Sequence, residues 1–441
     1  MAARLTCICL VLALCLATLS VRARGPKSQD QKLWALLVAG SNYWYNYRHQ
    51  ADVCHAYQIL HAHGIPDENI VVMMYDDIAD NEQNPTPGIV INHPDGHDVY
   101  KGVPKDYVGD DVNPRNFINV LTGNKAAMQN IGSGRVIESG PNDHVFVNFV
   151  DHGATGILAF PTGELSAKQL SDALMKLHNE KRYSKLVLYI EACESGSMFR
   201  NILPNNTNVF ATTAADYDES SYACYYDNKR GTYLGDWYSV NWMEDSDKEN
   251  IEQETLQTQF KLVKNITTTS HVQEYGDLSM GNLVVGEFQG EQEAPPKIAS
   301  KVPFRRGAPS WDVPLDILYK RLGAAKTEKE RQGLRSEIDA MIERRSYLET
   351  IVKKLVTRVA ISREHEERLT MSRSEYLTQL ECHHKLVKAF SRHCFDFGRN
   401  SYALKYAYIL ANMCEDGLDA EDTIRTMRQV CKVIDMTRRV D

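Results

Sequence analysis

Apolar runs of strand length alternate with amphipathic segments of helix length between residues 31 and 290. The runs are rich in Val, Ile, Leu, Phe and Ala, which is typical of strands buried on both faces of a parallel sheet. Residues 49–63 repeat apolar side chains at helical spacing, and Gly64 then ends the predicted helix. The alternation predicts an α/β fold, with a mostly parallel sheet flanked by helices. The predicted strands are residues 33–39, 70–75, 144–150, 185–191 and 208–214.

The pattern of apolar and polar positions changes after residue 290. Residues 291–325 concentrate proline among glycine and charged residues, which predicts a linker. Residues 326–441 return to helical periodicity without proline, which predicts a separate, all-α C-terminal bundle. Within the first part, residues 79–115 are rich in Pro, Gly, Asn and Asp and are predicted to form a long surface excursion.

The first 23 residues have the pattern of a secretory signal peptide, with an early Arg and a short apolar core. That core is too short to cross a bilayer, which needs roughly 20 apolar residues, and no later run suggests a membrane anchor. Residues 24–30 would then form a short N-terminal propeptide. The sequons at Asn205 and Asn265 are predicted glycosylation sites on the surface, in keeping with a secretory route.

Charge is divided unevenly along the chain. Residues 26–325 carry a net charge of −14, whereas residues 326–441 carry a net charge of +3. We therefore expect the acidic first part and the basic last part to attract each other, and we expect that attraction to weaken as carboxylates are protonated in acid. No nucleic-acid partner is predicted.

Cysteines fall into three groups. Three of the ten lie in the predicted signal peptide. Another three, Cys54, Cys193 and Cys224, are scattered through the predicted α/β part. Four lie near the end of the chain, and an even cluster in a secreted helical segment predicts two disulfides, with three pairings open. These four are Cys382, Cys394, Cys414 and Cys431.

Two predicted strands end in residues that suggest catalysis. His152 and Gly153 follow the apolar run 144–150, and Cys193 follows the run 185–191. Because ligands bind outside the carboxyl ends of parallel strands, the two side chains could meet at one edge of the sheet. A thiolate nucleophile beside an imidazole is the minimum equipment of a cysteine hydrolase. The backbone N–H of Gly153 could contribute to an oxyanion hole.

Four motifs in order along the chain resemble the legumain family of asparaginyl endopeptidases, which have a caspase-like fold. The resemblance runs from about residue 32 to the C-terminus and is dense over residues 238–247. A resemblance to caspases is weaker, because the sequence around Cys193 departs from their signature. The motifs are Tyr45-Asn-Tyr-Arg-His-Gln50, Asp151-His152-Gly153, Glu191-Ala-Cys-Glu-Ser-Gly196 and Ala223-Cys-Tyr-Tyr226.

The resemblance implies roles for individual residues. Cys193 would be the nucleophile, His152 its acid–base partner and Asn46 the residue that orients His152, with Asp151 a structural or electrostatic neighbour. A pocket of polar side chains would read the carbonyl and NH2 of a substrate Asn, and would accept Asp only when acid neutralises it. The pocket residues implied are Arg48, His49, Glu191, Ser221 and Asp236.

The resemblance also implies how the rest of the chain acts. Residues 31–290 would be the caspase-like protease domain, residues 291–325 an activation peptide that blocks the active site, and residues 326–441 a prodomain that covers the substrate groove. The zymogen would be latent near neutral pH and open in a lysosome, in an acidic endosome or after secretion. The disulfides would be Cys382–Cys414 and Cys394–Cys431. Cystatin-type inhibitors are candidate partners.

The linker departs from the pattern of the family. Relatives usually carry an Asn there as the self-cleavage site, and residues 291–330 contain none. Asp312 and Asp316 are the candidate alternatives in acid, unless another protease makes the cut. Trimming at the N-terminus would fall near Asp30.

Three alternative functions stay open on the sequence. One is a transpeptidase or ligase at Asn, since amine and water compete for the same acyl-enzyme. Another is a role like that of the GPI-anchor transamidase, for which a membrane anchor would be expected. The third is a non-catalytic, protease-inhibiting binding protein. We expect no cofactor and no metal site, because His61, His63, His383 and His384 lack partners at ligand spacing.

Overall fold

The computed structural model describes residues 31–297, 300 and 307–432. The predicted signal peptide, the propeptide and the trimming site near Asp30 lie outside the described residues. Within the described residues, no helix combines the length and the apolar character needed to cross a bilayer.

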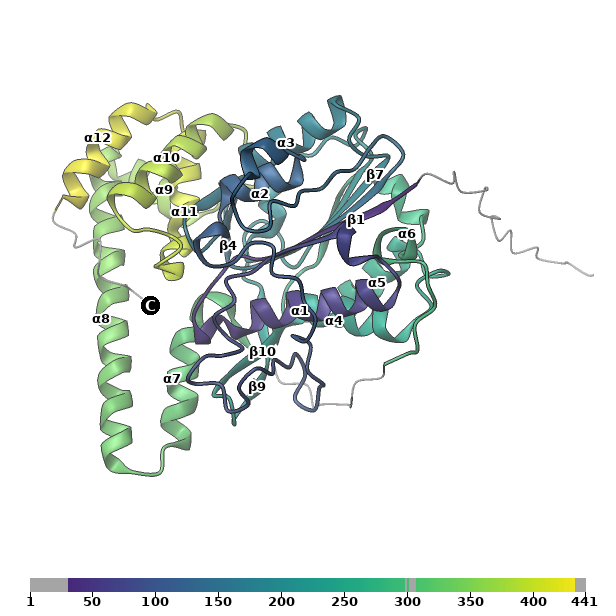
Figure 1. Ribbon diagram of the computed structural model, residues 1–441. Coiled ribbons are helices and arrows are strands. Elements are labelled where there is room, and N and C mark those ends of the chain that lie inside the picture. The colour runs from purple at the N-terminus through teal and green to yellow at the C-terminus, as the bar shows by residue number, and fades with distance from the viewer. Residues whose placement is uncertain (1–30, 298–299, 301–306, 433–441) are drawn as a thin grey trace, which may run out of the picture. The chain divides into compact units, whose positions relative to one another are not determined.

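A six-stranded sheet forms the centre of the α/β part, in the order β11-β8-β7-β3-β1-β2 (Figure 1). All neighbouring pairs are parallel except β11 with β8. The predicted, mostly parallel sheet is therefore confirmed, and the antiparallel edge strand β11 was not predicted. The strands are β1 (Leu33–Ala39), β2 (Ile70–Met73), β3 (His144–Val150), β7 (Lys185–Glu191), β8 (Val209–Thr213) and β11 (Gln273–Gly276).

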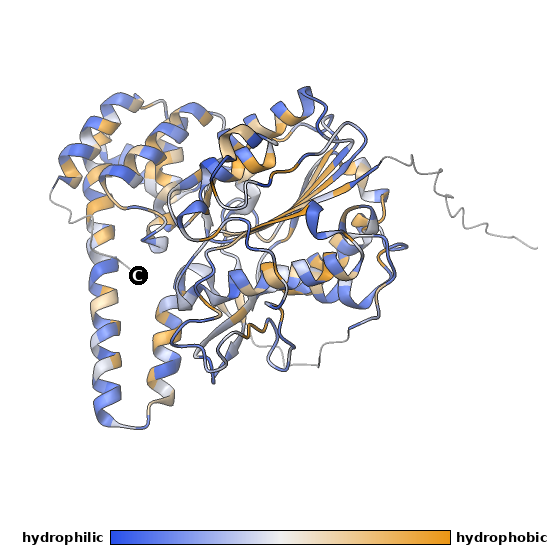
Figure 2. Cartoon of the chain, viewed as in Figure 1, coloured by the Kyte–Doolittle hydropathy of each residue, from blue (hydrophilic) through white to orange (hydrophobic). Residues whose placement is uncertain are grey.

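Helices pack against both faces of this sheet, because its central strands are apolar on both sides. One face lies against α2 and α3, which contribute Phe117 and Leu170 to the core. The other lies against α1, α4, α5 and α6, which contribute Tyr57, Trp242 and Phe260 among others. Figure 2 shows the central strands as the most apolar part of this domain. These helices are α1 (Tyr47–Ala62), α2 (Pro114–Leu121), α3 (Ala167–Asn179), α4 (Trp237–Lys248), α5 (Leu256–Ile266) and α6 (Gly286–Gln289).

Helix α3 begins where its capping box predicts. Ser166 Oγ accepts a hydrogen bond from the backbone N–H of Gln169, and the Gln169 side chain accepts the backbone N–H of Ser166. Residues 79–115, by contrast, are largely irregular, in keeping with the predicted excursion. Asn205 and Asn265 are exposed, which leaves both predicted glycosylation sites accessible.

Two small sheets lie beside the central one. The first has the order β10-β9-β12 and joins a hairpin of the α/β part to residues of the predicted linker. The second has the order β4-β5-β6 and directly follows His152. Their strands are β9 (Tyr222–Asp227), β10 (Thr232–Asp236), β12 (Ala308–Pro309), β4 (Gly153–Ala154), β5 (Ile157–Ala159) and β6 (Glu164–Ser166).

The C-terminal part is helical, as predicted. Helix α7 (Val313–Ala324) lies inside the segment predicted as linker and packs against α8 (Glu328–Val359). The remaining helices are α9 (Arg363–Met371), α10 (Leu380–His393), α11 (Ala407–Glu415) and α12 (Ala420–Cys431). Short 3-10 helices connect elements throughout, at Trp44–Asn46, Asp67–Asn69, Gly109–Asp111, Lys125–Met128, Ser195–Met198, Leu278–Asn282, Ser310–Asp312 and Ser401–Tyr406.

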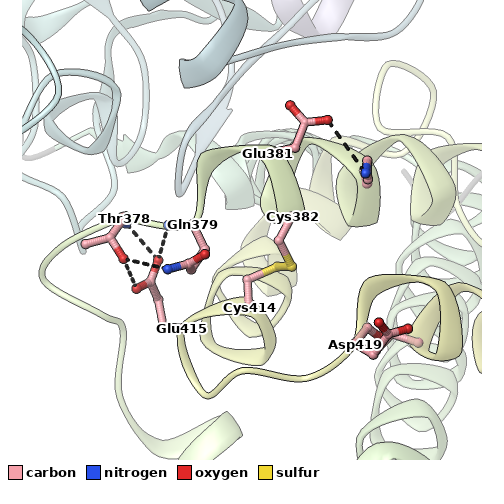
Figure 3. The surroundings of a disulfide bond; sticks show 9 residues. Thr378, Gln379, Glu381, Cys382, Cys414, Glu415 and Asp419 are labelled. Atoms are coloured by element: carbon pink, nitrogen blue, oxygen red, sulfur yellow. Dashed lines mark hydrogen bonds and ion pairs between the residues drawn. A yellow bond between two sulfur atoms is a disulfide. The ribbon is translucent and has the colours of Figure 1, made fainter.

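Both disulfides tie helices of this C-terminal part together. Cys382 of α10 is joined to Cys414 of α11, and Cys394 is joined to Cys431 of α12, which is the pairing that the resemblance implied. Beside the first disulfide, the Glu415 carboxylate accepts the backbone N–H groups that precede α10 (Figure 3). The core of this part also includes Ala154, Ile157 and Ala159 of β4 and β5, so the α/β and C-terminal parts share one hydrophobic cluster.

Candidate active site

The register of three parallel strands brings the candidate residues to one edge of the sheet. Ala39 of β1 is paired with Val150 of β3, and Val150 is paired with Glu191 of β7. His152 therefore lies just beyond the end of β3, and Cys193 lies just beyond the end of β7. Both side chains are buried in this form of the protein.

His152 has one ring nitrogen fixed by Asn46. The Asn46 side-chain NH2 donates to the backbone carbonyl of Asn42, so its oxygen faces His152 Nε2 at 2.9 Å. Since a carbonyl oxygen can only accept, Nε2 must carry the hydrogen and Nδ1 is left with a lone pair. The neutral tautomer thus presents Nδ1 as a base, and that nitrogen lies 3.3 Å from Ser310 Oγ.

The Cys193 thiol is surrounded by hydroxyl groups. Its Sγ atom lies 3.3 Å from Ser220 Oγ and 3.8 Å from Ser221 Oγ. Burial raises the pKa of Cys193 to about 11, although the hydrogen bonds from the two serines oppose that shift. Burial, together with the charge of Arg48, lowers the pKa of His152 well below its usual value. In this closed form both partners are therefore neutral.

Gly153 lies in β4 directly against the backbone of Cys193. A Cβ atom at Gly153 would come within 2.6 Å of the Cys193 carbonyl oxygen, which no side chain could tolerate. The close approach of these two segments explains why glycine follows His152.

Arg48 is a buried cation among the residues of the predicted substrate pocket. Its side chain is fully buried, and Nε donates to Asp236 Oδ1 at 2.9 Å. One terminal nitrogen donates to the Tyr45 carbonyl, and the other donates to Ser310 Oγ at 2.8 Å. An oxygen atom therefore already occupies the position that Arg48 offers to an acceptor.

His49 connects the pocket to the dyad. Its Nδ1 atom lies 2.6 Å from Ser41 Oγ and 3.2 Å from Asp151 Oδ1, and its ring packs edge-on against the His152 ring at 5.0 Å between centroids. Burial, with smaller effects of Arg48 and His152, lowers the pKa of His49 well below its usual value. A neutral His49 avoids placing a second positive charge beside Arg48.

Two carboxyl oxygens in the pocket have no hydrogen-bond partner among the described residues. They are Glu191 Oε1 and Asp236 Oδ2. The other Glu191 oxygen accepts both the backbone N–H and the hydroxyl of Ser239, each at 3.1 Å. Burial raises the pKa of both carboxyl groups, and Arg48 opposes that shift at Asp236. Asp236 Oδ2 lies 3.6 Å from His49 Nε2.

Ser310 of the linker contacts both Arg48 and His152 in the site. Strand β12 pairs with β9, and the Ser310 backbone N–H then continues this pairing by donating to the Ser221 carbonyl at 2.9 Å. The same N–H lies 3.2 Å from Ser220 Oγ. The linker therefore runs along β9 as an added strand, the mode in which many proteins bind extended peptides.

Sequence reasoning missed three residues of this site, namely Ser220, Ser239 and Ser310. Ser220 is adjacent to the predicted Ser221, but a lone serine carries no signal of its own. Ser310 could be placed only by knowing that β12 pairs with β9. The nine residues predicted by sequence all lie in or beside the site; they are Cys193, His152, Asn46, Gly153, Arg48, His49, Glu191, Ser221 and Asp236.

Ligand atoms of His49, Asp151 and His152 lie close enough together to hold a metal ion. Two of the ring nitrogens already form hydrogen bonds, because His49 Nδ1 is bonded to Ser41 Oγ and His152 Nε2 is bonded to Asn46 Oδ1. The histidines considered from the sequence have separate surroundings. His61 lies against Asp67, His63 against the Ile59 carbonyl, and His384 against Ser166.

Comparison with known proteins decides the family. Residues 33–291 match the peptidase C13 family. The chain belongs to that family. Residues 336–431 match the legumain prodomain.

Relatives in the peptidase C13 family cover almost the whole chain. Legumain of Rattus norvegicus is 52% identical over 404 residues, which are 91% of this chain and 92% of the relative. Legumain of Homo sapiens is 51% identical over 407 residues, 91% of this chain and 93% of the relative. The vacuolar-processing enzyme delta-isozyme of Arabidopsis thaliana is 40% identical over 432 residues, 92% of each.

A solved structure of caspase-1 from Spodoptera frugiperda also matches, with a TM-score of 0.34 and 10% identity, over 62% of this chain and 98% of that chain. The predicted resemblance to legumains is confirmed by the family and its relatives. The protein is thus a cysteine endopeptidase of the legumain type that carries a prodomain. Its family and its two disulfides agree with the predicted secretory route.

Proposed function

We propose that this peptidase C13 chain is a zymogen that cleaves peptide bonds after Asn through Cys193 and His152. The observation that carries the proposal is the fixed orientation of His152. Asn46 holds Nε2, and Nδ1 is left free at the position where Ser310 Oγ now lies. A base must lie within hydrogen-bond reach of the proton that it takes, and Nδ1 faces the segment that occupies the site.

The reaction would proceed in two halves. Cys193 Sγ attacks the carbonyl carbon of the scissile bond while its proton passes to His152 Nδ1, and the tetrahedral intermediate forms. His152 returns that proton to the leaving amine as the C–N bond breaks, which leaves a thioester. Water then attacks the thioester carbonyl while one of its protons passes to His152. His152 gives that proton to Sγ as the C–S bond breaks, which releases the carboxylic acid product and the Cys193 thiol. The N–H of Gly153 is the proposed donor to the oxyanion.

The pocket residues complement the side chain of Asn. In the closed form, Ser310 Oγ takes the hydrogen bond that Arg48 would donate to the side-chain carbonyl of Asn. The unpaired oxygens of Glu191 and Asp236 are acceptors for the two N–H groups of the amide. His49 and Ser221 line the same pocket from α1 and from the segment before β9. A side chain that left these buried groups unpaired would be rejected.

Cleavage after Asp should grow as pH falls. An ionised Asp would face the carboxyl groups of Glu191 and Asp236 and be repelled. The reference pKa of an Asp side chain is about 3.9, so the neutral form that resembles Asn becomes populated only as pH approaches that value.

The linker and prodomain would keep the site closed. Ser310 fills the pocket, and two prodomain cations reach buried carboxylates of the protease domain. Lys388 lies 3.2 Å from Glu164, and Arg373 lies 3.0 Å from Glu194. These contacts fit the prodomain as an intramolecular inhibitor.

Activation has two candidate sites in the described part of the linker. Asp312 is held by Arg345 of α8 at 2.8 Å, and Asp316 lies within α7, where it accepts from the Tyr233 hydroxyl at 2.6 Å. Both are therefore protected in the closed form. We propose that acid first loosens these contacts and that cleavage at one of the two follows.

The alternatives remain secondary. Ligation at Asn would use the same thioester, and no contact in the site separates it from hydrolysis. The residues needed for catalysis are present, which argues against a non-catalytic binding protein. A role like that of the GPI-anchor transamidase is less favoured, since the relatives and the prodomain match are those of legumains. An acidic lysosomal or endosomal compartment, with cystatin-type inhibitors as partners, fits the proposed activation.

The test uses the purified full chain, incubated at about pH 4–5, where carboxylates begin to protonate. Matched peptides with Asn, Asp or Ala before the scissile bond are then offered. We expect cleavage after Asn and its loss in Cys193→Ser. Cleavage that persists in this variant, or that ignores the Asn, would overturn the proposal.

A further inference from the structure

A buried carboxyl group, Asp52, lies behind the proposed Asn pocket. It is on α1, one turn after Arg48, and its side chain has no exposed surface. Its Oδ1 accepts from Asn92 Nδ2 at 2.7 Å, and its Oδ2 accepts the backbone N–H of Asp236 at 3.2 Å. Among the described residues, no Lys, Arg or His nitrogen forms an ion pair with it. A buried carboxyl group without a cation calls for an explanation.

Asp52 packs directly against the strand that ends in Asp236. A Cβ atom at Gly235 would lie 3.0 Å from Asp52 Oδ1 and 2.6 Å from Val240 Cγ1, so glycine is what allows this approach. Asp236 has no side-chain hydrogen bond to the start of α4 that could hold it instead. The orientation of Asp236 therefore depends on Asp52 on one side and on Arg48 on the other.

Asn92 holds Asp52 in place from the long excursion. Its Nδ2 atom donates both to Asp52 and to the Leu234 carbonyl, at 2.7 and 2.8 Å. Its Oδ1 atom lies 2.8 Å from His55 Nδ1, whose other nitrogen lies 2.8 Å from Asp247. This chain of contacts fixes which end of the Asn92 amide faces Asp52.

The charged groups around Asp52 are arranged unevenly. Asp236 pairs with Arg48, whereas Asp52 and Glu191 form no ion pair among the described residues. Burial, and then the charge of Asp236, raise the pKa of Asp52 well above its usual value. Burial also raises the pKa of Asp236, and the charge of Arg48 opposes that shift. The titratable groups around Asp52 are Arg48, His49, Cys54, His55, Glu191, Cys224 and Asp236.

We propose that Asp52 is a positioning residue for the Asn pocket, which holds the backbone of Asp236 so that the Asp236 carboxyl group faces the substrate side chain. The inference rests on the proposed function. Asp52 Oδ2 accepts the backbone N–H of Asp236, and Asp236 Oδ1 in turn accepts from Arg48 Nε. A substrate amide then finds an acceptor, and an ionised substrate Asp finds a negative charge.

The test compares Asp52→Ala and Asp52→Asn in the acid-activated full chain. Kinetics are measured with peptides that carry Asn or Asp before the scissile bond, between about pH 4 and 6.5. Asp52→Ala removes the acceptor of the Asp236 N–H, so we expect KM for Asn to rise by about tenfold, with kcat less affected, and the Asn-to-Asp preference to fall. Asp52→Asn keeps a side-chain oxygen that can accept the Asp236 N–H, so we expect KM for Asn within about threefold of the wild type.

Asp245→Ala is the matched control, since Asp245 is a buried carboxyl group on α4 that bonds Gln259, nine residues after Asp236. We expect it to leave the Asn-to-Asp ratio unchanged. An equal loss for Asn and Asp in Asp52→Ala would show a purely structural role and overturn the inference. So would an Asp52→Asn variant that folds but loses the preference as fully as Asp52→Ala. Failure of the wild type to cleave after Asn would instead overturn the proposed function.

Discussion

At the scale of single residues, the site depends on how polar atoms are oriented. The Asn46 oxygen is directed at His152 because its NH2 is bonded elsewhere, and this decides which ring nitrogen is the base. The same logic applies to the pocket, where Arg48 is held by Asp236 and by the Tyr45 carbonyl. Such groups act without rearranging, which is what makes a buried polar site selective.

The orientation of His152 leads to a prediction for Asn46→Ala. The variant loses the acceptor that fixes the tautomer, so we expect kcat for an Asn peptide to fall by about 10- to 100-fold, with little change in KM. Steady-state kinetics of the acid-activated enzyme measure this. Asn282→Ala, at an exposed position, serves as the control. A kcat equal to that of the wild type would show that Asn46 does not orient the base.

The sequence predicted the main candidate residues because His152 and Cys193 follow long apolar strands, and the family resemblance then placed the pocket. It could not predict Ser220 or Ser310, whose roles arise from contacts between segments distant in sequence. Asp52 carried no signal either, because a carboxylate on an amphipathic helix is ordinarily solvated. Only its burial against Gly235 reveals it.

At the scale of elements, the added strand β12 explains how the linker occupies the site. Its two residues, Ala308 and Pro309, have no strand-like pattern, and their pairing depends on the open edge of β9. This is why the sequence predicted only a linker here. The central strands were predicted well because burial on both faces makes them continuously apolar, whereas β11 is only partly buried and lacks that pattern.

The position of Ser310 leads to a prediction for Ser310→Asn. An Asn side chain there would meet Arg48 and the unpaired oxygens of Glu191 and Asp236. We expect faster self-cleavage in acid, with a new C-terminus at residue 310, detected by intact-mass measurement. Adding Cys193→Ser should abolish that product. A Ser310→Asn chain cut only at the wild-type position would contradict the proposed placement of the linker.

At the scale of the whole chain, the acidic protease domain and the basic prodomain are joined by buried contacts that respond to pH. His383 of α10 is one of them, since a Cβ atom at Gly156 would lie 2.9 Å from its ring. Burial, with the charge of His384, lowers the pKa of His383 to about 3. A solvated histidine has a pKa of about 6.5. Between these two pKa values, the docked form therefore binds fewer protons at His383 than the open form does. The contribution of His383 to docking is largest above about pH 6.5 and is lost as the pH falls.

This pH dependence of docking leads to a prediction for His383→Leu. The variant fills the buried position with an apolar side chain and removes the group that binds the proton. We expect opening of the prodomain to need a pH lower by about 0.5 to 1 unit. Hydrogen exchange of residues 153–159, followed against pH in a Cys193→Ser background, measures this opening. His97→Gln, at an exposed histidine, is the control. An unchanged midpoint in His383→Leu would show that other groups govern the release.

The most direct measurement of the central claim is covalent labelling of the full chain with an electrophilic peptide that ends in Asn. The chain is labelled at neutral pH and after acid activation, and peptide mass spectrometry then locates the adduct. We expect a single adduct on Cys193, formed only after activation. The yield of that adduct should fall when Ala replaces the Asn of the probe. Equal labelling of the neutral zymogen, or labelling of Cys54 or Cys224, would contradict it.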